Sequence, residues 1–349
     1  MKSISKAGSP SGRGPLRTTV REVAQRAGVS VATVSRAMNT SVPVSPELRE
    51  RVMEAARELG YKPNSTAQSL RRGKSKTVAL LVGDIEQSHF SALTKNIQLE
   101  LVARGLDLML HNLSHREELL THFLEEAPRM PLCGVVLASS DRIDAGVGSQ
   151  LRSIGSAGIR VVAAGQDLTK FDVPSVIHNE HAAARYSVEH LIRAGARRIA
   201  YVGRIEGSAI GTERLAGYSD ALSAADLPRD DALIWDESFR YPAGQRAVSR
   251  ALAAKIQFDA IQAGSDELAI GAMAALQDHG LRVPQDVKVI GFGNVEVSGF
   301  VRPALTTLSS HPIDMARHVC DLLGDAIKRK AVGSPLIVIE RGIVRRESA

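Results

Sequence analysis

The sequence predicts a small all-helical N-terminal domain followed by a large α/β domain of two lobes, each with a parallel sheet. Two observations lead to this prediction. Residues 18–72 contain four short helical patterns, each with its own start signal. From Thr77 onward, apolar runs of strand length alternate with longer helical patterns, as is typical of parallel sheets that helices cover on both faces.

The composition sets limits on the class of protein. The chain has 349 residues, of which 44% are hydrophobic and 23% charged, as expected for a globular protein of more than one domain. Its two cysteines, Cys133 and Cys320, cannot build a disulfide framework or a four-thiolate metal site. It has no apolar run of membrane-spanning length and no secretory signal at its basic start, so we expect a cytoplasmic protein without a membrane partner.

Charge is distributed unevenly along the chain. Residues 1–76 carry 15 Lys and Arg against 5 Asp and Glu, whereas residues 77–349 carry 29 against 33. A basic N-terminal region on a mildly acidic body is typical of a nucleic-acid-binding module joined to another domain. Charge alone fits a solubilising basic tail equally well.

Two short helices separated by a tight turn are expected at the start of the folded chain. Residues 1–17, rich in Ser, Gly, Pro and basic residues, are predicted to form a disordered basic tail. Thr19, followed three residues later by a glutamate, fits a capping box. The first helix should end near Gly28, and Ser30 should cap a second helix over Val31–Met38.

A third helix and a shorter fourth segment follow. Pro46 begins a helix expected to run to Leu59, and Asn64 caps a short segment over residues 65–72. The predicted boundaries are a tail at 1–17, a helical domain at 18–62, a short helix and linker at 63–76, and an α/β domain at 77–349.

The α/β domain contains too many strands for one ordinary doubly wound sheet. Strands are expected at Val78–Gly83, Leu106–His111, Gly134–Ala138, Arg160–Ala164, Ser175–Ile177, Ile199–Gly203, Ala232–Trp235, Ala260–Ala263 and Val287–Phe292. Helices between them include Glu180–Ala194, Arg214–Ala224, Gln245–Ala254 and Asp266–Asp278. We therefore expect two lobes of about five or six strands each.

A short helix, a glycine turn and a second short helix form the pattern of a DNA-binding helix-turn-helix, whose second helix lies in the major groove. Val34 and Ala37 should face the core, while Arg36 can reach a guanine edge. The caps at Thr19 and Ser30 leave positive helix ends for phosphates. The candidate DNA contacts of this unit are Thr19, Ser30, Val31, Ala32, Thr33, Ser35, Arg36 and Asn39. A helical bundle without a ligand would be equally compact.

Thr18–Leu81 resembles the N-terminus of the lactose-repressor (LacI/GalR) family of bacterial transcriptional regulators. The matching strings are T-V-R-E-V-A-Q-R-A-G-V-S-V-A-T-V-S-R-A-M-N, V-S-P-E-L-R-E-R-V and L-G-Y-K-P-N-S-T-A-Q-S-L. The resemblance implies that the segment beginning at Asn64 is a hinge helix, ordered when two subunits meet on their operator. Leu70, with Ala67 beside it, would then enter the minor groove and unstack a base step. In isolation Leu70 fits an ordinary linker leucine.

Strings in the α/β domain resemble the sensor domain of the same family, which has a periplasmic-binding-protein-like fold. They are E-H-L-I-R-A-G-A-R-R-I-A, E-R-L-A-G-Y, S-D-E-L-A-I-G-A and P-A-L-T-T-L. The resemblance implies a ligand cleft in which Arg214 grips oxygens, Asp266 accepts hydroxyl protons, and Phe90 and Phe239 form walls. The alternatives are a surface ion pair for Arg214, an N-cap for Asp266 and core positions for both aromatics.

The chain departs from the family at two positions near the expected pocket. His178 stands where many members carry Asp in V-D-N, and Gly293 stands where many carry Asp in G-F-D-D. Without these carboxylates the cleft is more positive, which favours an anionic effector such as a sugar acid over a neutral sugar. The G-F-G string also resembles members that sense gluconate-type compounds.

The predicted function is a sequence-specific DNA-binding regulator, a repressor, controlled by a small sugar or sugar-acid effector. It should bind a pseudopalindromic double-stranded operator as a homodimer, since the leucine heptads of tetrameric members are absent. No cofactor, metal site or enzymatic activity is predicted. The histidine pairs at 111 and 115 and at 178 and 181 lack a third ligand.

Two other classes of protein fit the sequence less well. A solute-binding protein of a sugar transport system would not carry a helix-turn-helix and would need a secretory signal. An α/β enzyme such as a sugar kinase would need a phosphate-binding loop, and the sequence contains none.

Overall fold

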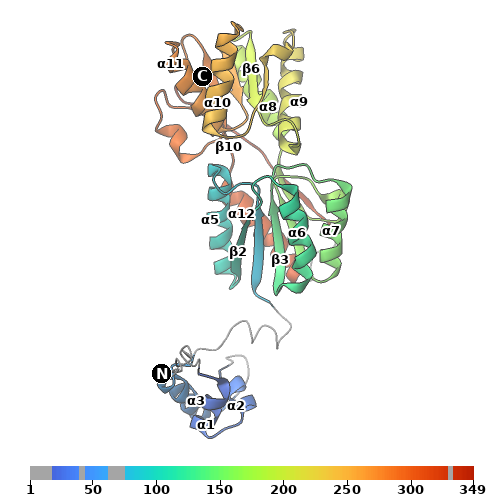
Figure 1. Ribbon diagram of the computed structural model, residues 1–349, viewed down its shortest axis with the longest axis vertical. Helices are drawn as coiled ribbons and strands as arrows, with labels where there is room; N and C mark the ends of the chain where they lie inside the picture. Colours follow the sequence, from blue (N-terminus) through green and yellow to red (C-terminus); the bar gives the residue numbers. More distant parts are fainter. Residues whose placement is uncertain (1–17, 39–43, 62–74, 329–332) are drawn as a thin grey trace, which may run out of the picture. The chain divides into compact units, whose positions relative to one another are not determined.

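The computed structural model describes residues 18–38, 44–61, 75–328 and 333–349 (Figure 1). The chain divides into two compact units, Met1–Lys74 and Ser75–Ala349, which are described separately. The predicted basic tail and the predicted hinge segment lie outside the described residues. So do four of the proposed DNA contacts: Asn39, Asn64, Ala67 and Leu70.

The described residues of the N-terminal unit contain three helices: α1 (Val20–Ala27), α2 (Val31–Ala37) and α3 (Pro46–Glu58). The capping box at Thr19 and Glu22 is confirmed, with the Thr19 hydroxyl accepting from the Glu22 backbone and the Glu22 carboxylate accepting from the Thr19 backbone. Gly28 ends α1 with a φ of 64°, the left-handed conformation that glycine adopts most readily. Val34 and Ala37 are buried in the shared core, as predicted.

Lobe 1 of the larger unit contains a six-stranded sheet of order β11-β5-β4-β3-β1-β2, in which every neighbouring pair is parallel. Its strands are β1 (Thr77–Val82), β2 (Asp107–Asn112), β3 (Leu132–Ala138), β4 (Arg160–Ala164), β5 (Ser175–His178) and β11 (Leu336–Ile339). Its helices are α5 (Ser88–Ala103), α6 (Glu117–Glu126), α7 (Ala145–Ser156) and α12 (Pro312–Ile327). After Thr77, β1 is apolar because alternate residues of 78–82 enter the α5/α12 core and the α6/α7 core.

Lobe 2 repeats this plan with the order β12-β10-β9-β8-β6-β7, in which only β12 is antiparallel. Its strands are β6 (Ile199–Gly203), β7 (Ile234–Asp236), β8 (Ala260–Ala263), β9 (Lys288–Gly293), β10 (Thr306–Ser309) and β12 (Ile343–Val344). Its helices are α8 (Glu180–Arg193), α9 (Ala209–Ala224), α10 (Tyr241–Ala253) and α11 (Asp266–Asp278). α8 and α9 bury one face of the sheet, and α10 and α11 the other.

The chain passes between the lobes three times, after β5, after β10 and after β11. Each lobe is therefore assembled from separate stretches of sequence. The residues at these crossings, 178–180, 309–312 and 340–342, lie at one edge of both sheets. This arrangement brings side chains from distant parts of the sequence to the junction of the lobes.

The predicted two-lobed fold with parallel sheets is confirmed, and most strands lie within one or two residues of their expected bounds. The strand expected at Ala232–Trp235 was misplaced, since residues 231–233 form a short 3-10 turn before β7. β10, β11 and β12 were not predicted. β10 contains three hydroxyl residues in four, so it has no apolar run of the kind that marks the other strands.

None of the described helices combines the length and the apolar character that a membrane-spanning helix needs.

Candidate functional site

The exposed face of α2 carries small and polar side chains. Ala32, Ser35 and Arg36 are exposed, while Val31 and Thr33 are partly buried. The Ser30 hydroxyl accepts from the Thr33 backbone at 3.1 Å and so fixes the start of this helix. Residues with such short side chains allow close approach of the helix to a base edge.

Arg36 is the one long side chain on this exposed face. No described residue forms an ion pair or hydrogen bond with its guanidinium, which is therefore available to an external partner. A guanidinium presents two parallel N–H groups, which match the O6 and N7 acceptors of guanine. The geometry is therefore compatible with the base contact predicted for Arg36.

The start of α1 differs from the expectation of a free positive helix end. The Glu22 carboxylate accepts from the Thr19 backbone at 2.6 Å and from its hydroxyl at 3.0 Å. A phosphate at Thr19 would have to approach a helix end that already holds a carboxylate. At Thr19 the Glu22 carboxylate therefore occupies the place that a phosphate was predicted to take. No carboxylate is among the described partners of Ser30.

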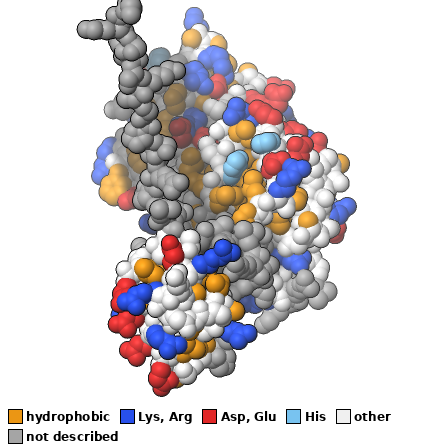
Figure 2. Space-filling model, turned by 60° about the horizontal axis from the view of Figure 1, so that its bottom comes forward, with side chains coloured by type: hydrophobic (Ala, Val, Ile, Leu, Met, Phe, Trp, Pro, Cys, Tyr) orange, Lys and Arg blue, Asp and Glu red, His pale blue; other side chains and the backbone are white. Residues whose placement is uncertain are grey.

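The described helices contribute little to the basic excess of the N-terminal region. Figure 2 shows basic and acidic side chains together on the face of this unit that comes forward. Residues 18–38 and 44–61 contain six arginines and five glutamates. Most of the excess positive charge of residues 1–76 therefore belongs to residues 1–17 and 62–74.

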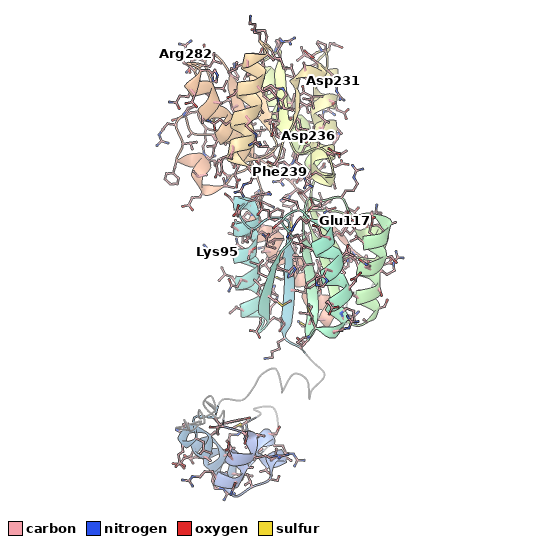
Figure 3. All side chains as sticks on the ribbon, in the orientation of Figure 1. Lys95, Glu117, Asp231, Asp236, Phe239 and Arg282 are labelled. Carbon is pink, nitrogen blue, oxygen red and sulfur yellow. The ribbon has the colours of Figure 1, made fainter. Side chains whose placement is uncertain are left out.

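A cavity lies where the two lobes of the larger unit meet. Phe90 contributes from α5, Arg214 from α9, and Phe239 from the loop before α10. Phe239 is labelled at the junction of the lobes in Figure 3. Three of the four predicted effector residues are thus brought together around one space. His178, Glu180 and Arg341, from two of the crossings, complete its polar wall.

Arg214 is buried rather than part of a surface ion pair, since its relative exposure is 8%. Its Nε donates to Glu180 Oε2 at 2.8 Å, and its Nη1 donates to the Gly264 carbonyl. Its guanidinium carbon lies 4.3 Å from the centre of the Phe292 ring and 5.9 Å from that of Phe239. Arg214 is therefore held in one orientation at the wall of the cavity.

Arg341 joins the three crossings. Its Nη2 donates to Glu180 Oε1 at 2.7 Å and to His178 Nδ1 at 3.1 Å, and its Nη1 donates to the Ser309 carbonyl at 2.8 Å. The other ring nitrogen of His178 faces the Ser310 carbonyl at 2.9 Å. A carbonyl only accepts, so His178 carries its proton on Nε2 and is neutral.

The charges of this cluster follow from its burial. Burial lowers the pKa of His178 to about 2, and the neighbouring Arg341 adds to the effect. Burial alone would raise the pKa of the Glu180 carboxyl, but Arg214 and Arg341 outweigh it and hold that pKa below its usual range. Glu180 is therefore ionised between two guanidiniums.

Asp266 does not line the cavity. Its carboxylate accepts from the Val295 backbone at 2.8 Å and from the Thr307 hydroxyl, so it ties the start of α11 to β10 and the loop after β9. Ser265, rather than Asp266, is the N-cap of α11. Burial raises the pKa of Asp266 to about 6, although both hydrogen bonds oppose the rise. Its predicted role toward an effector remains a prediction.

Polar contacts close the cleft from both sides. On one side Arg204 of lobe 2 pairs with Asp141 of lobe 1, and His115 lies 3.0 Å from the same carboxylate. Burial opposes ionisation of Asp141, but hydrogen bonds from His115 and Ser139 lower its pKa to about 2. On the other side the Ser88 backbone donates to Glu267 at 2.8 Å.

Within the described ranges, no group of three or more His, Cys, Asp or Glu side chains is arranged to hold a metal ion. His115 bonds to Asp141 and Gln87, and His181 bonds to Asp220. These contacts account for two members of the histidine pairs noted in the sequence.

Sequence reasoning missed Arg341 and Glu180 as parts of the cavity. Arg341 stands in the string E-R-G between two short apolar runs. A charged residue between two such runs was the only sequence feature that could have indicated its place at the cavity. Glu180 supplies a carboxylate where the sequence suggested that carboxylates were missing. The charge of Arg341 offsets that of Glu180. With Arg214 included, the cluster carries two positive charges and one negative charge.

Comparison with known families gives two matches. Residues 19–64 match the model of bacterial regulatory proteins of the lacI family, and residues 188–349 match the model of a periplasmic binding protein-like domain. Catabolite control protein A of Priestia megaterium is 30% identical over 334 residues, covering 95% of this chain and 99% of that protein. The transcriptional regulator GalR of Escherichia coli K12 is also 30% identical, covering 95% of both chains.

Solved structures support the same relationship. The complex of the transcriptional regulator CelR with cellobiose is 30% identical, with a TM-score of 0.72, covering 95% of this chain and all of that one. The lac repressor dimer bound to operator and the anti-inducer ONPF is 24% identical, with a TM-score of 0.81, covering 95% of this chain and 98% of that one. The second comparison supports the fold alone.

Proposed function

Because the chain belongs to the lacI family of bacterial regulatory proteins, we propose that it is a repressor that binds an operator as a homodimer under the control of a sugar or sugar acid. α2 reads the operator, and the cavity between the lobes holds the effector. DNA binding places the protein in the bacterial cytoplasm, where the chromosome lies.

The presence of two kinds of site in one chain supports this proposal most directly. α2 exposes small residues and Arg36, whose side chain has no partner among the described residues, and this suits a major groove. The cleft encloses buried charged groups beside Phe90, Phe239 and Phe292, which suits a small polar molecule with apolar ring faces. CelR, at 30% identity, was solved with cellobiose, and this likeness favours a sugar-type effector.

Control of DNA binding requires that the effector favour one arrangement of the lobes over another. The contacts of Arg204 with Asp141 and of Ser88 with Glu267 join the two lobes across the cleft. A molecule that fills the cavity between these contacts changes the balance between closed and open lobes. By linkage, the effector and the operator alter each other's affinity by the same factor.

Mobility-shift titration of the full-length protein on promoter fragments containing inverted repeats tests this function. We expect retarded complexes whose association constant falls steeply with salt, because each neutralised phosphate releases counterions. Addition of the effector should change the midpoint of the titration. If no fragment were bound at low ionic strength, with or without sugars and sugar acids, the proposed function would be wrong.

A further inference from the structure

The cavity between the lobes carries more positive than negative charge. Of the described residues that line it, three are always or predominantly charged: Glu180, Arg214 and Arg341. One carboxylate therefore faces two guanidiniums. Buried charges in proteins are normally paired, so this excess is a reason to look for an anion that completes the site.

The histidines at the cavity do not change this balance. His178 is neutral because it donates to a carbonyl through one nitrogen and accepts from Arg341 through the other. Burial and the charges of Arg341 and Arg214 lower the pKa of His89 to about 4. The positive charge thus comes from the arginines alone.

Unsatisfied hydrogen-bond donors point the same way. The side chain of Arg341 is only 4% exposed, and its Nε is buried without a partner among the described residues. The Ser140 hydroxyl, also at the cavity wall, is likewise buried without a described partner. Buried donors are nearly always satisfied in folded proteins, so acceptor atoms are expected in this space.

The two guanidiniums are also held ready for a ligand. Both lie against the face of Phe292, with guanidinium carbons 4.3 Å and 5.5 Å from the ring centre for Arg214 and Arg341. Glu180 fixes one edge of each. A preorganised guanidinium forms stronger and more selective bonds with a carboxylate than with a neutral hydroxyl.

We propose that the effector is a sugar acid and that Arg341, together with Arg214, binds its carboxylate and makes this site select anions over neutral sugars. The inference rests on the proposed function, because it takes the cavity to be the effector site. It assigns the charge preference to Arg341, a residue 127 positions after Arg214. The hydroxyls of the sugar chain face Ser140 and the Glu180 carboxylate.

Calorimetric titration of the full-length protein tests the charge preference. The probes are D-gluconate and D-glucuronate, compared with D-sorbitol and D-glucose, which have the same number of carbons and no charge. We expect at least one acid to bind at least tenfold more tightly than both neutral compounds, because charge-assisted hydrogen bonds are the stronger kind. Equal or tighter binding of a neutral compound, or no binding of either acid at millimolar concentration, would overturn the proposal.

Two substitutions at Arg341 test the assignment. Arg341→Gln should lower the affinity for the acid at least tenfold, and Arg341→Lys should restore part of it by returning the charge without the planar fork. Thermal melting shows whether each variant is folded. If Arg341→Gln bound the acid as tightly as the wild type, Arg341 would not be the residue that selects anions, and this part of the inference would be overturned.

Arg282→Gln is the matched control. It removes the same charge from an exposed arginine that pairs with Asp286, at the end of lobe 2 away from the cleft (Figure 3). Its acid affinity should equal that of the wild type, so a general charge effect can be separated from a local one. Operator binding by the same preparations distinguishes the two proposals, because a protein that binds operator but no acid refutes only the charge preference.

Discussion

Individual residues of this protein differ most in how their charges are matched. Arg204, Arg214 and Arg341 all pair with carboxylates, but Arg214 and Arg341 are buried and share one partner, Glu180. Arg36 is exposed and has no partner in the part of the chain that the structure describes. The first pattern suits a small anion and the second suits a base edge, so two arginine environments separate the two sites.

Arg36→Ala is expected to weaken operator binding by about 1–3 kcal/mol, and only on sequences that keep the base pair it contacts. The reason is that bidentate bonds to one guanine carry sequence information, whereas phosphate contacts do not. Dissociation constants on a series of single-base operator variants would measure this. Arg57→Ala, at the end of α3 where Arg57 bonds to its own helix, is the control and should leave base preference unchanged. An equal loss on every sequence would contradict a base-reading role.

Asp266→Asn is expected to change the pH dependence of stability. The folded state raises the pKa of Asp266 from 3.8 to about 6, so it binds a proton more readily than the unfolded chain does. The stabilising contribution of wild-type Asp266 is therefore full below its unfolded pKa and is lost as the pH rises through about 6. As the pH rises from about 4 to above about 6, the free energy of unfolding of the amide variant should increase by on the order of 3 kcal/mol relative to that of the wild type.

Chemical unfolding of both proteins between about pH 4 and about pH 7 would measure this difference. Other titrating groups act equally on both proteins and cancel in the comparison. A difference between variant and wild type that stays constant over the window would refute the raised pKa.

At the scale of elements, glycines set the distance between helices of lobe 2. A Cβ on Gly271 of α11 would lie 1.9 Å from the Tyr241 carbonyl, and one on Gly244 of α10 would lie 2.1 Å from the Leu268 carbonyl. The neighbouring atoms are backbone, which cannot rotate away as a side chain can. The two helices pack this closely only because both positions lack a side chain.

Gly271→Ala is expected to destabilise the protein by about 1–3 kcal/mol or more, because α10 and α11 must separate and lose packing. The matched control is Gly324→Ala in α12, where a Cβ would meet no atom within 4 Å. The control should stabilise by about 0.5–1 kcal/mol, since alanine favours a helix over glycine. Free energies of unfolding from denaturant titrations give both values, and the same sign for both substitutions would contradict the packing argument.

At the scale of the whole molecule, three crossings join the lobes at one edge while polar pairs join them across the cleft. Arg204 and Asp141 bridge the lobes, and the Ala209 backbone donates to the Ser140 carbonyl beside them. The Arg142 backbone donates across the same boundary to Gly207. Exposed and half-exposed ion pairs contribute little to stability, but they can shift a balance between closed and open lobes.

Arg204→Ala is expected to increase the population of open lobes by several-fold, because it removes about 1 kcal/mol of contact across the cleft. Hydrogen exchange at the Ala209 and Arg142 amides, whose bonds break on opening, would measure this. Arg185→Ala is the control, since Arg185 pairs with Glu189 within α8. Unchanged exchange at both amides would show that Arg204 does not hold the lobes together.

The N-terminal helices and most strands could be predicted from the sequence because their signals are local. A cap such as Thr19 acts within one helical turn, and an apolar run such as Val78–Gly83 reports burial on both faces of its strand. The family string E-R-L-A-G-Y contains Arg214, whereas Phe90 and Phe239 lie outside the quoted strings and were placed at the site only as what the resemblance implies. β10 to β12 were missed because they are short and carry polar or exposed residues.

The composition of the cleft was decided only by the tertiary structure. Arg341 meets Glu180 and His178 because the chain crosses between the lobes three times, and this joins residues more than 160 positions apart. Asp266 lies away from the cavity, where the loop after β9 and strand β10 each supply one of its hydrogen bonds. Local sequence determines helices, strands and caps, since these depend on neighbours along the chain. The charge of the cleft depends on which distant side chains share one buried volume, and only the folded chain brings them together.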